Sequence, residues 1–209
     1  MQGAGAIGKP FLAREPLFAH PATKVDGVPD SCVKTEDLTE LVVRAQTGAE
    51  TALEELVRRY QDRIAGFIYS LVGREDVIGD LSHSAFVKMI IHIKRLRAAQ
   101  SFEPWLFQIA RNTCFDHLRK ERLRRIFVPL ERRHEQIAAQ AERSDGRLEA
   151  FRAALADLPP RQRELIVLLE QNEFSYEELA QITRSSVSSV KSRLFRAREQ
   201  LRRRISDES

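Results

Sequence analysis

Apolar residues recur at every third or fourth position in three successive stretches of the first half of the chain, which predicts three amphipathic helices. The first stretch stops at Gly48 and the second at Gly73, and glycine commonly ends a helix. The third, with Ile90 on its inward side, runs to a polar break, KRLRAAQ, after which Ser101 can cap a fourth helix. Four helices with short connections make one domain, expected at residues 35–125.

A second group of apolar stripes begins near Leu148. Its first helix ends at Pro159-Pro160, a pair that also suits the start of the next helix. Further on, Ser175 is followed three residues later by Glu178, the spacing of a capping box at the start of a short helix. One more helix then reaches almost to the C-terminus, so a second helical domain is expected.

The segments outside these two groups lack a sustained apolar stripe. Residues 126–147 are interpreted as a flexible linker, and residues 1–34, with several prolines and glycines, as a mostly disordered tail. The alternation of apolar and polar residues that is typical of strands is almost absent. The expected fold is therefore all-α, with two small helical domains at residues 35–125 and 148–205 joined by the linker.

The last predicted helix carries one apolar and one polar face. The apolar residues are spaced by three and four positions: Val187, Val190, Leu194, Ala197 and Leu201. Small hydroxyl and basic side chains occupy the other side: Ser188, Ser189, Lys191, Ser192, Arg193 and Arg196. Together with the short capped helix and a three-residue turn, Thr183-Arg184-Ser185, this pattern predicts a helix-turn-helix. Serines allow a helix to approach a DNA major groove closely, and basic side chains neutralise phosphates.

The formal net charge of +4 is unevenly distributed along the sequence. Residues 111–133 contain eight basic and three acidic side chains, and residues 184–204 contain eight basic and one acidic. The other parts of the chain are neutral or acidic. Two cationic segments, each at the end of a domain, suggest two contacts along one polyanion, although arginine-rich helix faces can also be merely solvated.

Several kinds of chemistry are not indicated. The two cysteines, Cys32 and Cys114, suit neither a disulfide framework nor a zinc knuckle, and a reducing cytoplasm fits them. The histidines have no ligand spacing, so neither a metal site nor a cofactor is expected. Clustered carboxylates are missing, as is a nucleophile beside a base, so no enzyme is predicted. No apolar run approaches the ~20 residues of a membrane span, and no signal-peptide core is recognisable, so membrane insertion is not expected.

Both predicted domains carry motifs of one protein family. The segments LPPRQRELIVLLEQNEFSYEELAQI and VSSVKSRLFRAREQL resemble region 4 of bacterial sigma-70 factors of the extracytoplasmic-function (ECF) group. The segment FEPWLFQIARNTCFDHLRKERLRR resembles region 2 of that group, and DVIGDLSHSAFVKMI occupies the place of its polymerase-binding helix. The resemblance covers about residues 36–205. It implies an alternative sigma factor, a non-enzymatic protein that binds core RNA polymerase and directs promoter-specific transcription initiation.

The resemblance also implies partners and contact residues. Core RNA polymerase and promoter DNA are the expected partners, and such factors are commonly held inactive by an anti-sigma factor. Region 4 would read the duplex −35 element through the −35 set: Arg184, Ser185, Ser186, Ser188, Ser189, Lys191, Ser192, Arg193 and Arg196. Region 2 would hold the melted −10 element through the −10 set: Lys94, Arg95, Arg97, Asn112, Asp116, Arg119, Lys120 and Arg122. Polymerase would be bound through the polymerase set: Asp80, Leu81, His83, Ser84 and Phe86.

The chain departs from the family pattern in the polymerase-binding helix and in the helix-turn-helix. The polymerase-binding helix usually carries Gln-Glu where this chain has His83-Ser84, so a charge that faces polymerase in the family is lost. The recognition helix usually opens with Gly-Thr, and here Ser188-Ser189 stands there. The turn before it lacks the glycine often found in the family.

Some alternatives remain open at the level of sequence. The loss of Gln-Glu leaves room for a DNA-binding regulator that does not engage polymerase, whereas a nuclease or recombinase would lack catalytic residues. Trp105 fits core packing better than base stacking because it lies on an apolar stripe. Asp116 can contact bases or pair with Arg119 or Lys120 one turn on, and pairing is favoured. Phe195 lies between the two faces of its helix, and either role is open for it.

Overall fold

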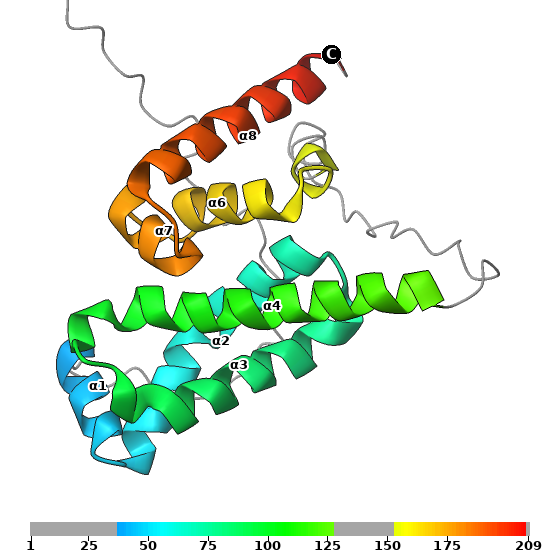
Figure 1. The fold of residues 1–209 in the computed structure, drawn as a ribbon. Coiled ribbons are helices and arrows are strands. Elements are labelled where there is room, and N and C mark those ends of the chain that lie inside the picture. Colours follow the sequence, from blue (N-terminus) through cyan, green and yellow to red (C-terminus); the bar gives the residue numbers. More distant parts are fainter. Residues whose placement is uncertain (1–36, 128–152, 208–209) are drawn as a thin grey trace, which may run out of the picture.

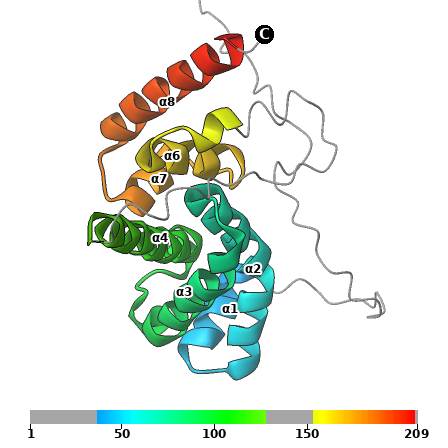
Figure 2. The ribbon, with the colours of Figure 1, turned by 90° about the vertical axis from the view of Figure 1, so that its right-hand side faces the viewer.

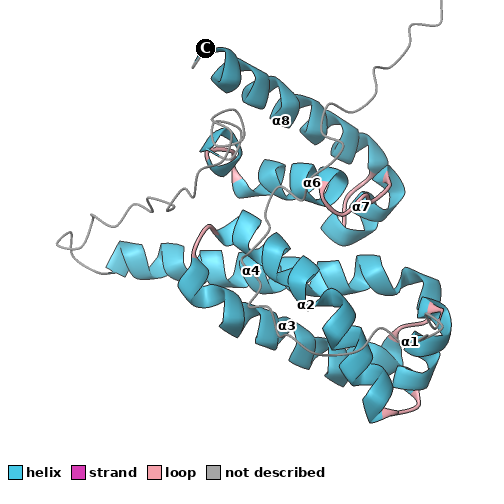
Figure 3. Cartoon of the chain, turned by 180° about the vertical axis from the view of Figure 1, so that it is seen from behind, coloured by secondary structure: helices cyan, strands magenta, loops and turns pink. Residues whose placement is uncertain are grey.

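The computed structural model describes residues 37–127 and 153–207, and these residues fold into helices joined by short loops, with no strand among them (Figure 3). The all-α expectation is therefore confirmed. The residues proposed as a tail and nearly all of those proposed as a linker lie outside the described ranges. No helix within the described ranges is both long and apolar enough to cross a lipid bilayer.

Residues 37–127 form the N-terminal body. Its α-helices are α1 (Leu38–Gln46), α2 (Glu50–Val72), α3 (Ile78–His92) and α4 (Phe102–Phe127) (Figure 1). Short 3-10 turns lie between them: η1 (Glu75–Val77), η2 (Ile93–Arg95) and η3 (Ala99–Ser101). The polar break after the third helix thus contains two tight turns that carry the chain from α3 back along α4.

Helix ends in this body follow the local sequence. Asp37 precedes α1, and its carboxylate accepts a hydrogen bond from the Thr39 backbone N–H at 3.5 Å. Gly73 ends α2 in the left-handed conformation, with a φ of 73°, and its N–H donates to the Tyr69 carbonyl oxygen at 2.7 Å. Gly48 has a φ of 94° and separates α1 from α2. Both glycine ends expected from the sequence are confirmed.

The apolar faces of α2, α3 and α4 pack together into a core that includes Phe67, Met89 and Phe107, each 1% exposed or less. The rings of Phe67 and Phe107 meet edge to face at 5.5 Å between centroids. The expectation that Ile90 faces inward is wrong, since 43% of its surface is exposed. The residue after buried Met89 lies about 100° further around the helix, which carries Ile90 out of the contact with α2 and α4.

Residues 153–207 form the C-terminal body, built around α6 (Pro160–Glu170), α7 (Tyr176–Thr183) and α8 (Val187–Asp207). Pro160 occupies the first position of α6, as expected. The capping box is also confirmed, since Ser175 Oγ accepts from the Glu178 N–H at 3.2 Å and Glu178 Oε2 accepts from the Ser175 N–H at 2.8 Å. The beginning of the preceding helix lies outside the described residues.

The two bodies pack against each other, with α7 on α4 and α6 on α2 (Figures 1 and 2). Phe174 of the C-terminal body meets Phe107 of α4 edge to face at 5.0 Å between ring centroids. Five successive residues of α6, 164–168, are buried. A helix buried on all sides lies between two partners, here the N-terminal body and α8.

Candidate nucleic-acid interface

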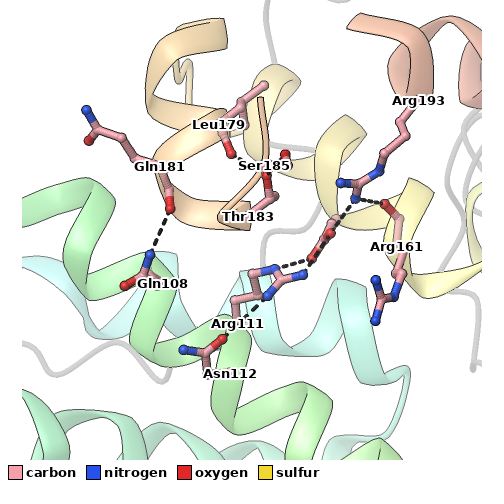
Figure 4. A network of polar contacts seen from close by, with 10 residues as sticks. Gln108, Arg111, Asn112, Arg161, Leu179, Gln181, Thr183, Ser185 and Arg193 are labelled. Carbon is pink, nitrogen blue, oxygen red and sulfur yellow. Dashed lines mark hydrogen bonds and ion pairs between the residues drawn. The ribbon is translucent and has the colours of Figure 1, made fainter. Parts of the chain in front are cut away.

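The helix-turn-helix is held by three local polar contacts. Thr183 Oγ1 lies 2.7 Å from the Leu179 carbonyl oxygen and 2.7 Å from Ser185 Oγ (Figure 4). Ser186 Oγ accepts a hydrogen bond from the Ser189 N–H at 3.2 Å and so caps α8. The turn is therefore Arg184–Ser186, one residue later than expected, because Thr183 still belongs to α7.

Arg184 occupies the place in the turn where a glycine would be at ease. Its φ of 51° and ψ of 50° lie in the left-handed region, which is unfavourable for a residue with a Cβ atom. Its backbone N–H donates to the Gln181 carbonyl oxygen at 3.2 Å, so the reversal between the two helices is complete without glycine. The chain therefore keeps the left-handed turn geometry although it lacks the glycine often found in the family.

The two faces of α8 are those expected from the sequence. Four residues of the apolar stripe are buried: Val190, Leu194, Ala197 and Leu201. Four members of the −35 set are exposed along the other side: Ser188, Lys191, Ser192 and Arg196. Phe195 is 67% exposed and so takes no part in the core. This side of α8 is a basic, hydroxyl-rich surface on a helix held from behind by packing.

Other members of the −35 set are occupied by contacts within the protein. Arg193 is the clearest case, because its Nη2 donates to Glu164 Oε1 at 2.7 Å and to the Arg161 carbonyl oxygen at 2.6 Å. Ser185 is held by Thr183, and Ser186 caps α8. The structure thus brings part of the −35 set onto one surface and turns Arg193 toward α6.

The −10 set falls into separate places along α4 instead of one patch. Lys94, Arg95 and Arg97 are exposed in the break before α4, whereas Arg119, Lys120 and Arg122 are exposed near its other end (Figure 1). From Phe102 to Arg119 the helix rises ~26 Å, at ~1.5 Å per residue. The two basic groups therefore cannot contact the same nucleotide.

The two remaining members of the −10 set lie between these ends. Asn112 is half-buried in the middle of α4, and its Oδ1 accepts from Arg111 Nη1 at 3.4 Å. Asp116 is exposed and accepts a hydrogen bond from Arg119 at 2.9 Å, the pairing favoured from the sequence. Trp105 packs against the core beside Phe102, with the ring centroids 6.1 Å apart.

The polymerase set divides between surface and core. Asp80 and His83 are exposed on α3 and Ser84 is half-buried, but Leu81 and Phe86 are each only 8% exposed and belong to the core. The exposed side of α3 also carries apolar residues that the sequence pattern assigned to the interior or did not single out: Val87, Ile90 and Ile91. Ile90 faces an open, mainly apolar groove between α3 and α2.

A buried acidic residue that the sequence did not single out joins the two bodies. Glu164 of α6 is 0% exposed, and its carboxylate accepts hydrogen bonds from Arg111 Nε at 2.6 Å and Arg111 Nη2 at 3.2 Å (Figure 4). With the bond from Arg193, one carboxylate binds a guanidinium from each body; these three residues are the Glu164 cluster. The only signal in the sequence is an acid that directly precedes the apolar run LIVLL.

Further contacts surround the cluster. Arg163, beside Glu164, is partly buried and donates to the carbonyl oxygens of Ser70 and Leu71 at 3.4 and 3.3 Å, at the end of α2. Burial lowers the pKa of Arg163 from its usual value. Gln108 of α4 donates to the Gln181 carbonyl oxygen at 2.7 Å (Figure 4). The interface is thus polar at several points as well as aromatic.

Metal ligation and thiol chemistry find no support in the described part of the chain. No three histidine, cysteine or acidic side chains come together there in a way that could hold a metal ion. Cys114 is fully buried in α4, as expected for a core residue, and burial raises the pKa of its thiol to about 12. A thiol in that state is unreactive at neutral pH.

Comparisons with known proteins agree with this geometry. Residues 56–124 match the family model for sigma-70 region 2, and residues 148–201 match the model for sigma-70, region 4. An ECF RNA polymerase sigma-E factor of Haemophilus influenzae is 31% identical over 193 residues, which cover 81% of this chain and 97% of that protein. The factor of the same name from Escherichia coli strain K12 is 32% identical over 190 residues, covering 82% of this chain and 96% of its own.

Two solved structures are similar as well. CnrH in complex with the cytosolic domain of CnrY gives a TM-score of 0.64 at 25% identity, covering 82% of this chain and 99% of that one. The sigma factor RpoE in complex with the anti-sigma factor NepR from Bartonella quintana gives 0.59 at 27% identity, covering 73% and 96%. Two region models in the family's order, on two helical bodies, define a sigma-70 factor. The chain belongs to the ECF group of RNA polymerase sigma factors, alternative sigma factors of transcription initiation.

Proposed function

We propose that the two bodies divide a promoter between them, with residues 148–205 reading the −35 element as duplex and residues 35–125 holding the −10 element and core RNA polymerase. The protein would act by recruiting polymerase and would not be an enzyme itself. Because its template is bacterial DNA, it would work in the cytoplasm. The observation that carries the proposal is the exposed face of α8, a basic and serine-rich surface on the second helix of a helix-turn-helix.

For the −35 element, α8 would lie in the major groove with its N-terminal turn toward the bases. Ser188 and Ser192 are exposed and small, so their hydroxyls can reach base edges or phosphates. Lys191 and Arg196 flank them and would neutralise phosphates, which makes affinity dependent on salt. Arg193 would join them only after leaving Glu164.

For the −10 element, the exposed end of α4 would form a cationic track for the displaced strand. Arg119, Lys120 and Arg122 are exposed there, and Asn112 lies two to three turns before them. A base taken out of the stack needs hydrogen-bonding groups, which Asn112 can supply. The exposed bases of the break, residues 94–97, would contact DNA at the opposite end of α4.

The proposed polymerase contact is the exposed side of α3. Asp80 and His83 offer polar groups there, while Leu81 and Phe86 would shape the contact from the core. An anti-sigma factor is a further proposed partner, because RpoE, a similar sigma factor, was solved with the anti-sigma factor NepR.

Run-off transcription tests the proposal. Purified protein would be mixed with core RNA polymerase and fragmented DNA of its own genome, and the transcript starts would be sequenced. Discrete new starts with a shared pair of upstream elements are expected. Salt-sensitive DNA binding without transcripts would instead favour a regulator that does not recruit polymerase.

A matched variant separates those two outcomes. The double substitution His83→Gln and Ser84→Glu restores the usual family residues on α3, at one exposed and one half-buried position. If wild-type protein is silent and the double variant transcribes, the DNA-reading surfaces are sound and only the polymerase contact has been lost. If both are silent although core polymerase and DNA are bound, the proposed sigma activity is wrong.

A further inference from the structure

We propose that the Glu164 cluster is a latch that holds the free protein closed, and that promoter binding must release it. The consequence of release rests on the division of the promoter proposed above, but the existence of the latch does not. The bodies meet through the same helices that would read the two promoter elements. The latch therefore couples domain opening to DNA binding.

The closed arrangement is too short for a promoter. Arg184 in the helix-turn-helix lies 3.4 Å from Gln108 of α4, measured from Nη2 to Oε1. From Gln108 the helix rises only ~21 Å to Arg122, the last member of the −10 set. The −35 and −10 elements are about 25 base pairs apart, roughly 85 Å of duplex at ~3.4 Å per pair. One molecule cannot read both elements while these contacts persist.

The chain is long enough to open. Residues 128–152 join Phe127, at the end of α4, to the C-terminal body. A segment of that length can span up to roughly 85 Å at ~3.4 Å per residue. Opening therefore requires no unfolding of either body, and what opposes it is the interface itself.

The cluster is a strong point of that interface because its carboxylate is fully buried. Glu164 is 0% exposed, and a buried carboxylate needs charged or hydrogen-bonding partners to remain ionised. Arg193 supplies one guanidinium from the same body, and Arg111 supplies two donors from the other. Charge-assisted bonds of this kind are stronger than neutral ones. Withdrawal of Arg111 removes two of the three bonds at once.

DNA competes directly for one member of the latch. Arg193 belongs to the −35 set, yet its guanidinium is committed to Glu164 and to the Arg161 carbonyl oxygen. A phosphate that attracts Arg193 weakens the hold on Glu164, and Glu164 is the group that retains Arg111. Duplex binding and opening therefore favour each other, and the coupling is reciprocal.

The first test measures closure in the full-length free protein. A fluorophore pair would be attached at Glu54→Cys on α2 and Gln200→Cys on α8, both exposed positions, in a Cys32→Ser background. Cys114 can stay because its thiol is buried. Single-molecule energy transfer should show a mainly closed wild type. Arg111→Gln should raise the open-to-closed ratio about tenfold or more, the effect of losing charge-assisted hydrogen bonds.

Matched variants make the test specific to the latch. Arg58→Gln removes the same charge from an exposed residue of the N-terminal body and should leave the ratio unchanged. Glu164→Gln should open the protein as Arg111→Gln does, and the double variant should open it little further, because both act on one contact. If Glu164→Gln fails to fold, Arg111→Gln still decides. A wild type that is already open, or an Arg111→Gln protein as closed as wild type, would overturn the latch.

The second test measures coupling to DNA. A duplex that carries only the upstream element mapped by run-off transcription would be titrated with each protein. Arg111→Gln lies outside the C-terminal body, so a higher duplex affinity can arise only through opening, by up to the inverse of the open fraction. Unchanged affinity despite opening would overturn the coupling. Opening by Arg111→Gln without any run-off transcripts would support the latch and count only against the proposed sigma activity.

Discussion

The two basic surfaces of this protein differ in how they are supported. The α8 surface lies on one side of a helix whose other side is buried, with Leu194 and Ala197 among the packed residues. The basic end of α4 has no such backing, because its bases between residues 119 and 122 are exposed together with Leu123, which is 49% exposed. A helix backed by packing presents a fixed face suited to a groove. A helix end that is exposed on several sides offers charge without a single face, which suits a flexible strand.

The largest effect should come from removing the support behind α8. Leu194 is 2% exposed, so Leu194→Ala should lower the free energy of unfolding of the C-terminal body by about 2–5 kcal/mol. Urea denaturation followed by circular dichroism would measure it. The neighbouring Phe195, 67% exposed, is the matched control, and Phe195→Ala should change stability by about 0.5 kcal/mol or less. Equal losses for both variants would contradict the packed-face description of α8.

The next effect separates the two surfaces by their salt dependence. Replacing Arg119, Lys120 and Arg122 with glutamine should reduce the slope of log affinity against log salt by about 2 for a single-stranded −10 oligonucleotide, at ~0.7 per phosphate contact. Fluorescence anisotropy across a salt series would measure it. The slope for a −35 duplex should stay the same, and an equal fall in both slopes would show that the surfaces do not divide the DNA.

A single charge on α8 gives a smaller change. Arg196→Gln should reduce the salt slope for a −35 duplex by about 0.9, because one phosphate contact is lost. Arg198, two residues on, is the control, since its guanidinium pairs with Glu170 at 3.1 Å instead of joining the −35 set. Arg198→Gln should leave the slope unchanged. The same reduction for both variants would mean that general charge, and not the exposed face, sets the affinity.

The sequence predicted features that depend on near neighbours. The glycine ends at Gly48 and Gly73, the capping box of Ser175 and Glu178, and the apolar stripe of α8 are all local patterns, and all are observed. Each is set by residues within about one helical turn, where periodicity and capping rules apply. Helix positions were therefore predictable.

Features that depend on how distant helices meet were not predictable in this way. Ile90 is exposed because its helix has more apolar residues than its two neighbours cover. Glu164 is buried because Arg111, 53 positions earlier, packs over it. Arg193 looks like another exposed base on α8 until α6 is in place beside it. Charge patterns in the sequence identify basic helices but do not show which bases are already paired.

The smallest expected effect lies in the turn that joins the two helices of the DNA-reading unit. Arg184 has a φ of 51°, so Arg184→Gly should relieve backbone strain and raise the free energy of unfolding by about 0.5–1 kcal/mol, after the greater freedom of glycine in the unfolded chain is subtracted. Arg184→Ala loses the same guanidinium but keeps the Cβ atom, so the difference between the two variants isolates the backbone contribution. Urea midpoints would measure stability, and −35 duplex affinity should fall equally in both. A glycine variant no more stable than the alanine variant would mean that the turn stores no strain, and the absence of glycine there would then have no energetic consequence.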